Sequence, residues 1–244
     1  MQSFRPAQAD AAALHFMSGL SLLLRADHAF WVGAVRLRGG RTAQRDLQHG
    51  WRGRAVLPLR TSVFRKGITA RAMREQDGSA PSLTTQAITA EAGNRRVRRI
   101  RDLVSYSAFA RTRPFQALWA PLGIVDRIYA VTPINADSES YFCFDLEHTQ
   151  RRFSLEDSLV VGLAVQALRG LHVNLLLSRG LLVGKTPLTP GERQVLQLLL
   201  GELTERGIGE KLGLSRSTTH HHVGSIFRKL GVTSRHALTA LWLS

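Results

Sequence analysis

The chain has 244 residues, enough for one large domain or two ordinary ones, and its hydrophobic content of 44% excludes a disordered protein. It is strongly basic, with 33 Lys and Arg against 18 Asp and Glu, which makes nucleic acid the leading class of partner. Only four of the cations are lysines, and such an arginine bias can reflect genome composition, so charge alone does not identify the partner.

The cysteine content and the hydropathy both favour a cytoplasmic protein. The single cysteine, Cys143, excludes an internal disulfide and a multi-cysteine metal cluster, and we expect it to be a small buried side chain on a strand. The N-terminus lacks the basic-then-apolar pattern of a signal peptide. Residues 159–184 are apolar but are interrupted by Arg169 and Arg179, so we expect no membrane span.

Helical and strand-like patterns alternate along the first 180 residues. The stretch Leu14 to Leu24 predicts an apolar helix, and the runs HAFWVGAVRL and GWRGRAVLPLR predict strands. The runs VDRIYAVTPI and ESYFCFDL predict two further strands joined by the polar turn NADS. Ser154 and Asp157 then cap a long amphipathic helix over FSLEDSLVVGLAVQALRGLHVNLLLS.

A basic segment, NRRVRRIRDLV, precedes the last two strands. Val97, Ile100 and Val104 form one stripe with five arginines around it, which favours an ordinary amphipathic helix with a solvated basic face. The alternative is a surface for the DNA backbone or an acidic partner. The aromatic residues of this half could line a pocket or form the core of a sheet domain; they are Trp31, Trp51, Tyr106, Trp119, Tyr129 and Phe142.

The order of these elements resembles that of GAF/PAS-like sensor domains. The resemblance implies an α+β fold with a ligand pocket on one face of the sheet and a final helix that couples the pocket to the rest of the protein. An acyl-homoserine-lactone pocket is the less favoured alternative, because we do not find its usual spacing of Trp, Tyr and Asp. The acidic cluster of a receiver domain is also missing from the start of the chain.

The segment LLVGKTPLTPGE carries Gly184, Pro187, Pro190 and Gly191 between two apolar, helix-like stretches. We therefore predict a sensor-like domain over residues 1–180, a linker over 181–187 and a second, all-α domain over 188–244.

Four short helices are expected in the second domain. The first has Thr189 as its N-cap, Pro190 at the first helical position and Glu192 completing a capping box. Two of the helices stop at a glycine suited to a left-handed conformation. The remaining N-caps are Thr204, Ser215 and Ser234, and the two glycine stops are Gly213 and Gly231. The tight turn between the second and third helices predicts a helix-turn-helix unit.

The third of these helices has two distinct faces. At about 100° per residue, Thr219, Val223, Ile226 and Leu230 fall on one narrow arc, which we expect to face the core. The opposite arc is polar, holds no acid and suits a major groove. It consists of Ser217, His220, His221, Gly224 and Arg228.

Three adjacent histidines, His220, His221 and His222, lie within this helix. Consecutive helical residues diverge, so the three cannot converge on one metal ion, and a mid-helix position does not fit a purification tag. We expect His220 and His221 to point outwards, either to contact DNA or simply to be solvated, and His222 to pack at the edge of the core.

The region 188–238 resembles the LuxR-type (GerE-type) DNA-binding domain of bacterial transcription regulators. The positions in register include Leu188, Thr189, Glu192, Val195, Leu196, Ile208, Leu212, Ser215, Thr218, His222, Ile226, Lys229, Leu230, Gly231, Val232 and Arg235. The chain departs from the family pattern at Gly191, Gly207, Gly209, Thr219 and His220, where Arg, Glu, Ala, Val and a basic residue are usual. The departures at 191 and 207 are expected to loosen a salt bridge and to remove a capping box.

The resemblance implies that the third helix enters the major groove of double-stranded DNA, with His220, His221 and Gly224 near base edges. Nearer the phosphates it implies Thr218, Arg228 and Lys229, although the two cations could instead be a solvated helix end that favours the dipole. The other residues expected at this surface are Ser217, Arg216 and Lys211. A homodimer is expected, because one such helix reads too few base pairs.

The sequence holds no G-x-S-x-G, H-E-x-x-H or Walker motif, so we expect neither an enzyme nor a metal or cofactor. The alternative is a small-molecule-binding or enzymatic protein with a basic tail that localises it to nucleic acid.

Overall fold

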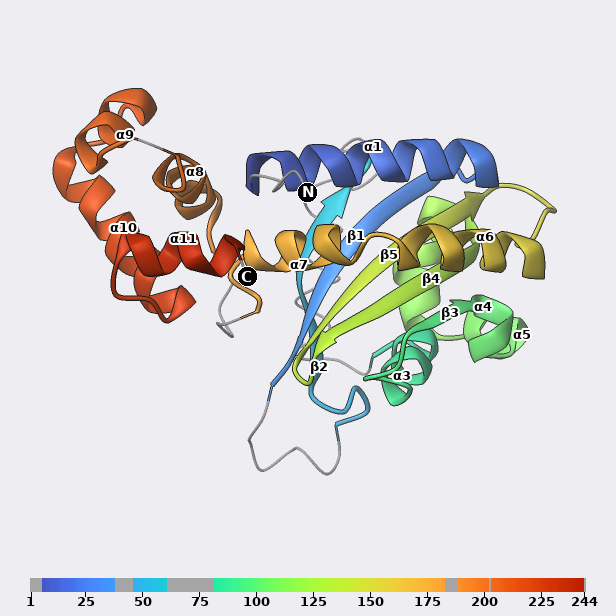
Figure 1. Ribbon diagram of the computed structural model, residues 1–244. Helices are drawn as coiled ribbons and strands as arrows, with labels where there is room; N and C mark the ends of the chain where they lie inside the picture. The colour runs from blue at the N-terminus through green and yellow to red at the C-terminus, as the bar shows by residue number, and fades with distance from the viewer. Residues whose placement is uncertain (1–5, 38–45, 61–80, 183–187, 202, 244) are drawn as a thin grey trace. The chain divides into compact units, whose positions relative to one another are not determined.

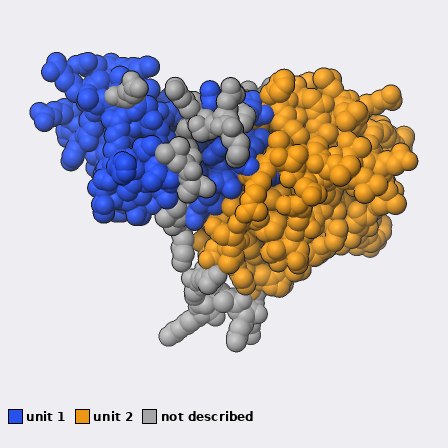
Figure 2. Space-filling view, viewed as in Figure 1, with its two compact units in different colours: residues 1–12, 170–244 blue, residues 13–169 orange. Residues whose placement is uncertain are grey.

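A computed structural model describes residues 6–37, 46–60, 81–182, 188–201 and 203–243. Contacts divide the chain into two compact units, one of residues 13–169 and one of residues 1–12 with 170–244 (Figure 2). The predicted linker 181–187 falls inside the second unit, and most of it lies outside the described residues. The division into a sensor domain before it and a DNA-binding domain after it stays a prediction.

The first unit is built on a five-stranded antiparallel sheet (Figure 1). All four strands expected from the alternating patterns are present, and the turn between the last two lies where NADS predicts it. The strands are β1 (His28–Arg36), β2 (Trp51–Pro58), β3 (Arg96–Arg99), β4 (Ile124–Asn135) and β5 (Ser138–Glu147), in the order β2-β1-β5-β4-β3. The expected α+β class is confirmed.

Helices cover both faces of this sheet, as the alternation along β5 requires. Phe142 points to the face covered by α1 (Pro6–Leu24), where its ring centroid lies 5.1 Å from that of Phe16. Cys143 points to the opposite face and is buried there, as expected. The helices on that second face are α3 (Leu83–Ala90), α4 (Ile100–Leu103), α5 (Tyr106–Ala110) and the short turns η2 (Phe115–Trp119) and η3 (Ala120–Leu122).

The long helix expected after the sheet is instead two helices, α6 (Leu155–Gln166) and α7 (Arg169–Leu177). The predicted capping box of Ser154 and Asp157 is present at the start of α6. The expected amphipathic pattern is wrong for α6, because it packs on β3 and β4 while keeping leucines exposed on its outer side. No single helix of the described residues is long and apolar enough to cross a membrane, although α6 and α7 pass that test as a bent pair.

The basic segment NRRVRRIRDLV is also not the expected helix. Its first half is the edge strand β3, paired with β4, and only Ile100–Leu103 is helical. Three of its five arginines are ion-paired within the unit, while Arg95 and Arg101 are exposed. The pairs are Arg96 with Glu139, Arg98 with Glu91 and Arg99 with Asp102.

The second unit contains the four predicted short helices, α8 (Pro190–Leu199), α9 (Glu205–Leu212), α10 (Arg216–Leu230) and α11 (Arg235–Leu243). Thr189, Thr204 and Ser215 are N-caps, and Gly213 and Gly231 end their helices in the left-handed conformation, as predicted. The shared core consists of Leu188, Val195, Leu196, Leu199, Ile208, Val223, Ile226, Leu230 and Leu238.

Candidate functional site

The helix α10 separates a core face from an exposed face as its sequence predicts. Thr219, Val223, Ile226 and Leu230 are at most 3% exposed and pack against α8 and α9. The side opposite them is solvent-exposed and nearly free of apolar groups; it presents Ser217, His220, His221, Gly224 and Arg228. Gly224 has no heavy atom within 4 Å of where a Cβ would be, so the backbone is open to a ligand there.

An acidic side chain lies beside this face, which sequence reasoning missed. Nδ1 of His220 lies 3.1 Å from Oε2 of Glu205, which belongs to the first turn of α9. The exposed arc of α10 itself carries no acid, but a neighbouring helix supplies one. His220 therefore has a protein partner as well as access to solvent.

His222 behaves differently from its two neighbours. Its ring is partly buried, and it lies against the start of α8, where a Cβ added at Gly191 would be 3.5 Å from its Cε1 atom. The ring of His221 lies 6.3 Å away, edge to face. This is the position at the core edge that the helical phase predicts for His222, and an arginine in place of Gly191 would compete with it for space.

A buried ion pair joins α8 to the end of α10. Nζ of Lys229 lies 2.7 Å from Oε2 of Glu192, and the hydroxyl of Ser225 donates to the other carboxylate oxygen at 2.7 Å. Burial raises the pKa of Glu192, but these two groups and the backbone N–H of Thr189 together lower it to about 2. The loosening of a salt bridge by Gly191 stays a prediction.

Lys229 of this pair is also one of the residues expected near phosphates. Its side chain is 17% exposed and its ammonium group is held by Glu192, so it contributes to the packing of the domain. Its expected contact with DNA stays a prediction. The other residues expected to contact DNA all lie at the surface: Lys211, Arg216, Ser217, Thr218, His220, His221, Gly224 and Arg228. Arg228 also donates a hydrogen bond to Ser225 at 3.3 Å.

The departures at 207 and 209 have visible consequences. Thr204 accepts a hydrogen bond from the N–H of Gly207, but glycine provides no side chain to return one, so the capping box is half made, as expected. A Cβ at Gly209 would lie 3.0 Å from Oγ1 of Thr219 and 3.1 Å from the carbonyl oxygen of Leu214. The glycine thus makes room for the threonine that replaces valine.

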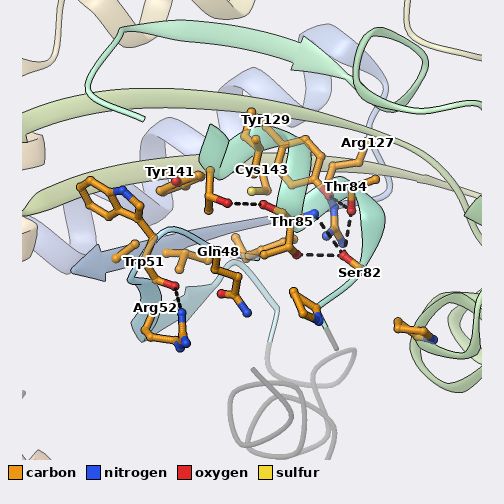
Figure 3. A pocket seen from close by; sticks show the side chains of 18 of the residues that line it. Gln48, Trp51, Arg52, Ser82, Thr84, Thr85, Arg127, Tyr129, Tyr141 and Cys143 are labelled. Carbon is orange, nitrogen blue, oxygen red and sulfur yellow. Dashed lines mark hydrogen bonds between the residues drawn. The ribbon is translucent and has the colours of Figure 1, made fainter. Parts of the chain in front are cut away.

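The first unit holds a cavity of about 210 Å³ between the sheet and α3 (Figure 3). Aromatic side chains, several hydroxyls and two arginines line it, and no described lining residue is an acid. Of the aromatic residues noted in the sequence, Trp51, Trp119 and Tyr129 reach this cavity, whereas Trp31 and Phe142 belong to the core of the other sheet face.

The guanidinium of Arg127 lies between aromatic rings and a carboxylate at the cavity. Its Cζ atom lies 4.2 Å from the ring centroid of Trp119 and 4.7 Å from that of Phe30, and its Nε and Nη2 atoms donate to Asp145 at 2.5 and 2.7 Å. Burial lowers the pKa of Arg127, but the charge of Asp145 raises it by more, so the group stays charged. The sequence alone does not indicate that Arg127 pairs with Asp145 at a cavity. Within the strand pattern Arg127 directly follows Asp126, and nothing nearby points to a partner on another strand.

Comparison with known protein families supports the assignment of the C-terminal helices to a DNA-binding domain. The family described as "Bacterial regulatory proteins, luxR family" matches residues 186–242. No curated protein sequence matches the chain.

Among solved structures, SdiA in complex with octanoyl-rac-glycerol is 14% identical over 95% of this chain and 86% of that one, with a TM-score of 0.45. Escherichia coli SdiA is 13% identical over 96% and 95%, with a TM-score of 0.41. The VqsR LBD domain from Pseudomonas aeruginosa is 13% identical over 66% and 82%, with a TM-score of 0.44. With the exposed polar face of α10, the family match at residues 186–242 identifies a luxR-family helix-turn-helix domain, and the chain is a DNA-binding transcriptional regulator.

Proposed function

We propose that α10 reads the major groove of double-stranded DNA through His220, His221 and Gly224, while Arg216, Thr218 and Arg228 contact phosphates. The observation that carries this proposal is the separation of α10 into a buried arc and an exposed polar arc within a matched family domain. Ser217 lies on the same exposed arc, and Lys211 at the end of α9 adds a further cation. A helix of this kind is wide enough to fill the groove and polar enough to bond base edges.

The test is selection of preferred sequences from a random DNA pool by the full chain at physiological salt. Specific binding should retain a consensus, and its affinity should fall as salt rises, because phosphate contacts release counterions. Binding that falls with salt but selects no consensus would contradict the proposal. That result would favour the second candidate function, a small-molecule-binding or enzymatic protein whose basic C-terminal part only localises it to nucleic acid.

The first unit is proposed to be the sensing domain, and the cavity between the sheet and α3 its ligand site. Its aromatic walls with a few convergent polar groups are the usual make-up of a small-molecule site. Native mass spectrometry of the full chain tests this by looking for a bound small molecule. The same preparation, before and after the ligand is removed, should differ in its affinity for the selected DNA.

A homodimer formed through α6 is part of the proposed function. Leu155, Leu159 and Leu163 are 67%, 67% and 73% exposed and lie four residues apart, so they form one apolar stripe. A groove between this helix and β3 runs beside them, lined by Val97 and Val131 among others. An exposed stripe of this size on a regulator calls for a partner surface.

A second copy of the chain fits this stripe by charge. Glu156 is exposed at the start of α6, and Arg95 lines the groove together with Gln166 at its end. If two α6 helices pair about a two-fold axis, the acidic start of each lies against the surface of the other copy, where Arg95 lines the groove. Such a dimer would present two copies of α10 to two half-sites.

The dimer is tested by sedimentation of the full chain. Leu159→Glu should shift the mass from dimer to monomer and weaken binding to a two-half-site DNA. Leu22→Glu is the matched control, because Leu22 on α1 is 79% exposed and lies outside the stripe. A wild-type monomer at micromolar concentration, or equal effects of both substitutions, would contradict the proposed interface.

The proposed function also includes a place and a class: the regulator acts in the cytoplasm and is not an enzyme.

A further inference from the structure

We propose that the ligand of the cavity beside α3 is a small planar carboxylate. This inference rests on the proposed sensing role of the first unit and names the class of ligand for that site. It is drawn from the charges that border the cavity, the hydroxyl groups at one end of it and the rings that form its walls (Figure 3).

Among the described residues that line the cavity, both charged ones are cations. Arg127 lines it, but its partner Asp145 does not. Arg52 lines it as well, while its partner Asp46, 3.2 Å away, does not. The cavity is therefore lined by the basic residue of each of two ion pairs and by neither of their acidic partners among the described residues. This lining favours a negative charge on the ligand.

The groups that could add negative charge to the cavity are held neutral. Burial raises the pKa of Cys143 to about 12 and also raises the pKa values of Tyr129 and Tyr141. The thiol and the two phenols thus remain protonated near neutral pH. No described lining residue is a carboxylate that would repel an anion or form an ion pair with a ligand ammonium group.

The first turn of α3 brings hydroxyl groups to the same cavity. Ser82 is the N-cap of this eight-residue helix, and its hydroxyl lies 3.0 Å from that of Thr84 and 2.8 Å from that of Thr85. The Tyr129 hydroxyl donates to Oγ1 of Thr84 at 3.3 Å. Hydroxyls can reorient to donate to an incoming oxygen, and the positive end of the helix dipole adds to the two guanidinium groups. A buried carboxylate requires such donors, because it loses its hydration.

The walls restrict the rest of the ligand to a flat body. Trp51 lies on one side of the cavity in Figure 3, and Tyr129, Tyr141 and Cys143 lie along the sheet. Phe30 and Trp119 complete an aromatic lining around Arg127. Rings favour stacking with another planar group. At about 210 Å³ the cavity is smaller than drug-sized sites of roughly 300–1,000 Å³, so a single ring with its carboxylate is a suitable probe.

The experiment compares benzoate, benzamide and benzylamine on the full chain, because the three share one ring and differ in charge. Fluorescence of Trp51 and Trp119 and titration calorimetry report binding. Benzoate should bind about tenfold more tightly than benzamide, since charge-assisted hydrogen bonds are the stronger ones, and benzylamine should not bind at a comparable concentration. Equal or tighter binding of benzamide, or no binding of benzoate, would overturn the inference.

Arg52→Gln tests the charge directly. It should weaken benzoate binding roughly tenfold and leave benzamide binding within about twofold. Arg54→Gln is the control, because Arg54 lies on the same strand and does not line the cavity. If Arg52→Gln leaves the preference for benzoate unchanged, the inference is wrong.

The outcomes of this comparison are separable from those of the proposed function. A native small molecule that proves to be uncharged, found by mass spectrometry and able to change DNA affinity, would overturn the carboxylate and leave the sensing role intact. A chain that binds benzoate but shows the same DNA affinity with and without it would instead argue against the sensing role.

Discussion

The carboxylate of Glu192 lies 2.7 Å from the ammonium nitrogen of Lys229, and this pair joins the first turn of α8 to the last turn of α10. Both side chains are largely buried, and Ser225 satisfies the second carboxylate oxygen. The same carboxylate also accepts from the backbone N–H of Thr189, so a single residue caps α8 and fixes α10 against it.

We predict that Glu192→Gln lowers the free energy of unfolding by about 2 kcal/mol at pH 7, because it leaves Lys229 without a buried counter-charge. The pKa of Glu192 is lowered from 4.5 to about 2 in the folded state. A carboxylate whose pKa is lower when folded contributes stability above pH 4.5 that is lost as the pH falls toward 2. Denaturant unfolding between pH 7 and pH 3 should therefore show a smaller acid-induced loss in Glu192→Gln than in wild type.

Glu210→Gln serves as its control, because Glu210 is 66% exposed and pairs with the exposed Arg206. Solvent-exposed ion pairs of this kind contribute little to the free energy of unfolding. If the free energy of unfolding falls equally steeply with decreasing pH in wild type and Glu192→Gln, Glu192 is not the titrating group.

We predict that Glu205→Gln tightens DNA binding by roughly two- to fivefold at low salt. Glu205 supplies a negative charge next to His220 on the face proposed to meet DNA, and its removal reduces a repulsion of phosphates that is least screened at low salt. Titration of labelled DNA at several salt concentrations measures the effect, which should shrink as salt rises. Unchanged affinity at every salt concentration would place Glu205 away from the bound DNA.

The C-terminal helices could be predicted because their signals are local. Ser215 caps α10 through the N–H three residues on, and Gly231 ends it at a positive φ of 65°, so short stretches of sequence specify both ends. The burial of Val223 and Ile226 follows from the helical period in the same way. The pairs Glu192–Lys229 and His220–Glu205 join separate helices, and no local pattern specifies them.

The basic segment shows where periodicity fails. Val97 and Ile100 fit one stripe of a helix, but Arg96 is buried by its bidentate bonds to Glu139, and β3 forms because β4 offers it a partner. The pairing of Arg96 with Val131 depends on a strand distant in the sequence, so the eleven residues of the segment cannot specify it by themselves. The break between α6 and α7 is similar, since no proline marks Ala167 as a C-cap.

We predict that His221→Ala changes the preferred DNA sequence with little effect on stability, whereas His222→Ala lowers the free energy of unfolding by about 1–2 kcal/mol. His221 is exposed on the outer arc, and His222 is partly buried against the start of α8. Thermal unfolding and selection from a random DNA pool separate the two effects. If both variants melt with the wild type and weaken DNA binding alike, the assignment of faces on α10 is wrong.

We predict that Gly224→Ala stabilises the domain by about 0.5–1 kcal/mol and at the same time weakens specific DNA binding. Glycine inside a helix costs about that much relative to alanine, and an added Cβ at 224 meets no protein atom within 4 Å. If α10 lies in the groove as proposed, the methyl group occupies the space where a base edge approaches the backbone. Gly207→Ala is the matched control, because Gly207 lies within α9 and is not part of the exposed arc of α10, and its added Cβ would meet Leu203 at an ordinary 3.4 Å. Both variants should melt above the wild type, and only Gly224→Ala should lose affinity for the selected DNA. Equal DNA affinity of the two variants would show that Gly224 does not lie at the contact with the groove.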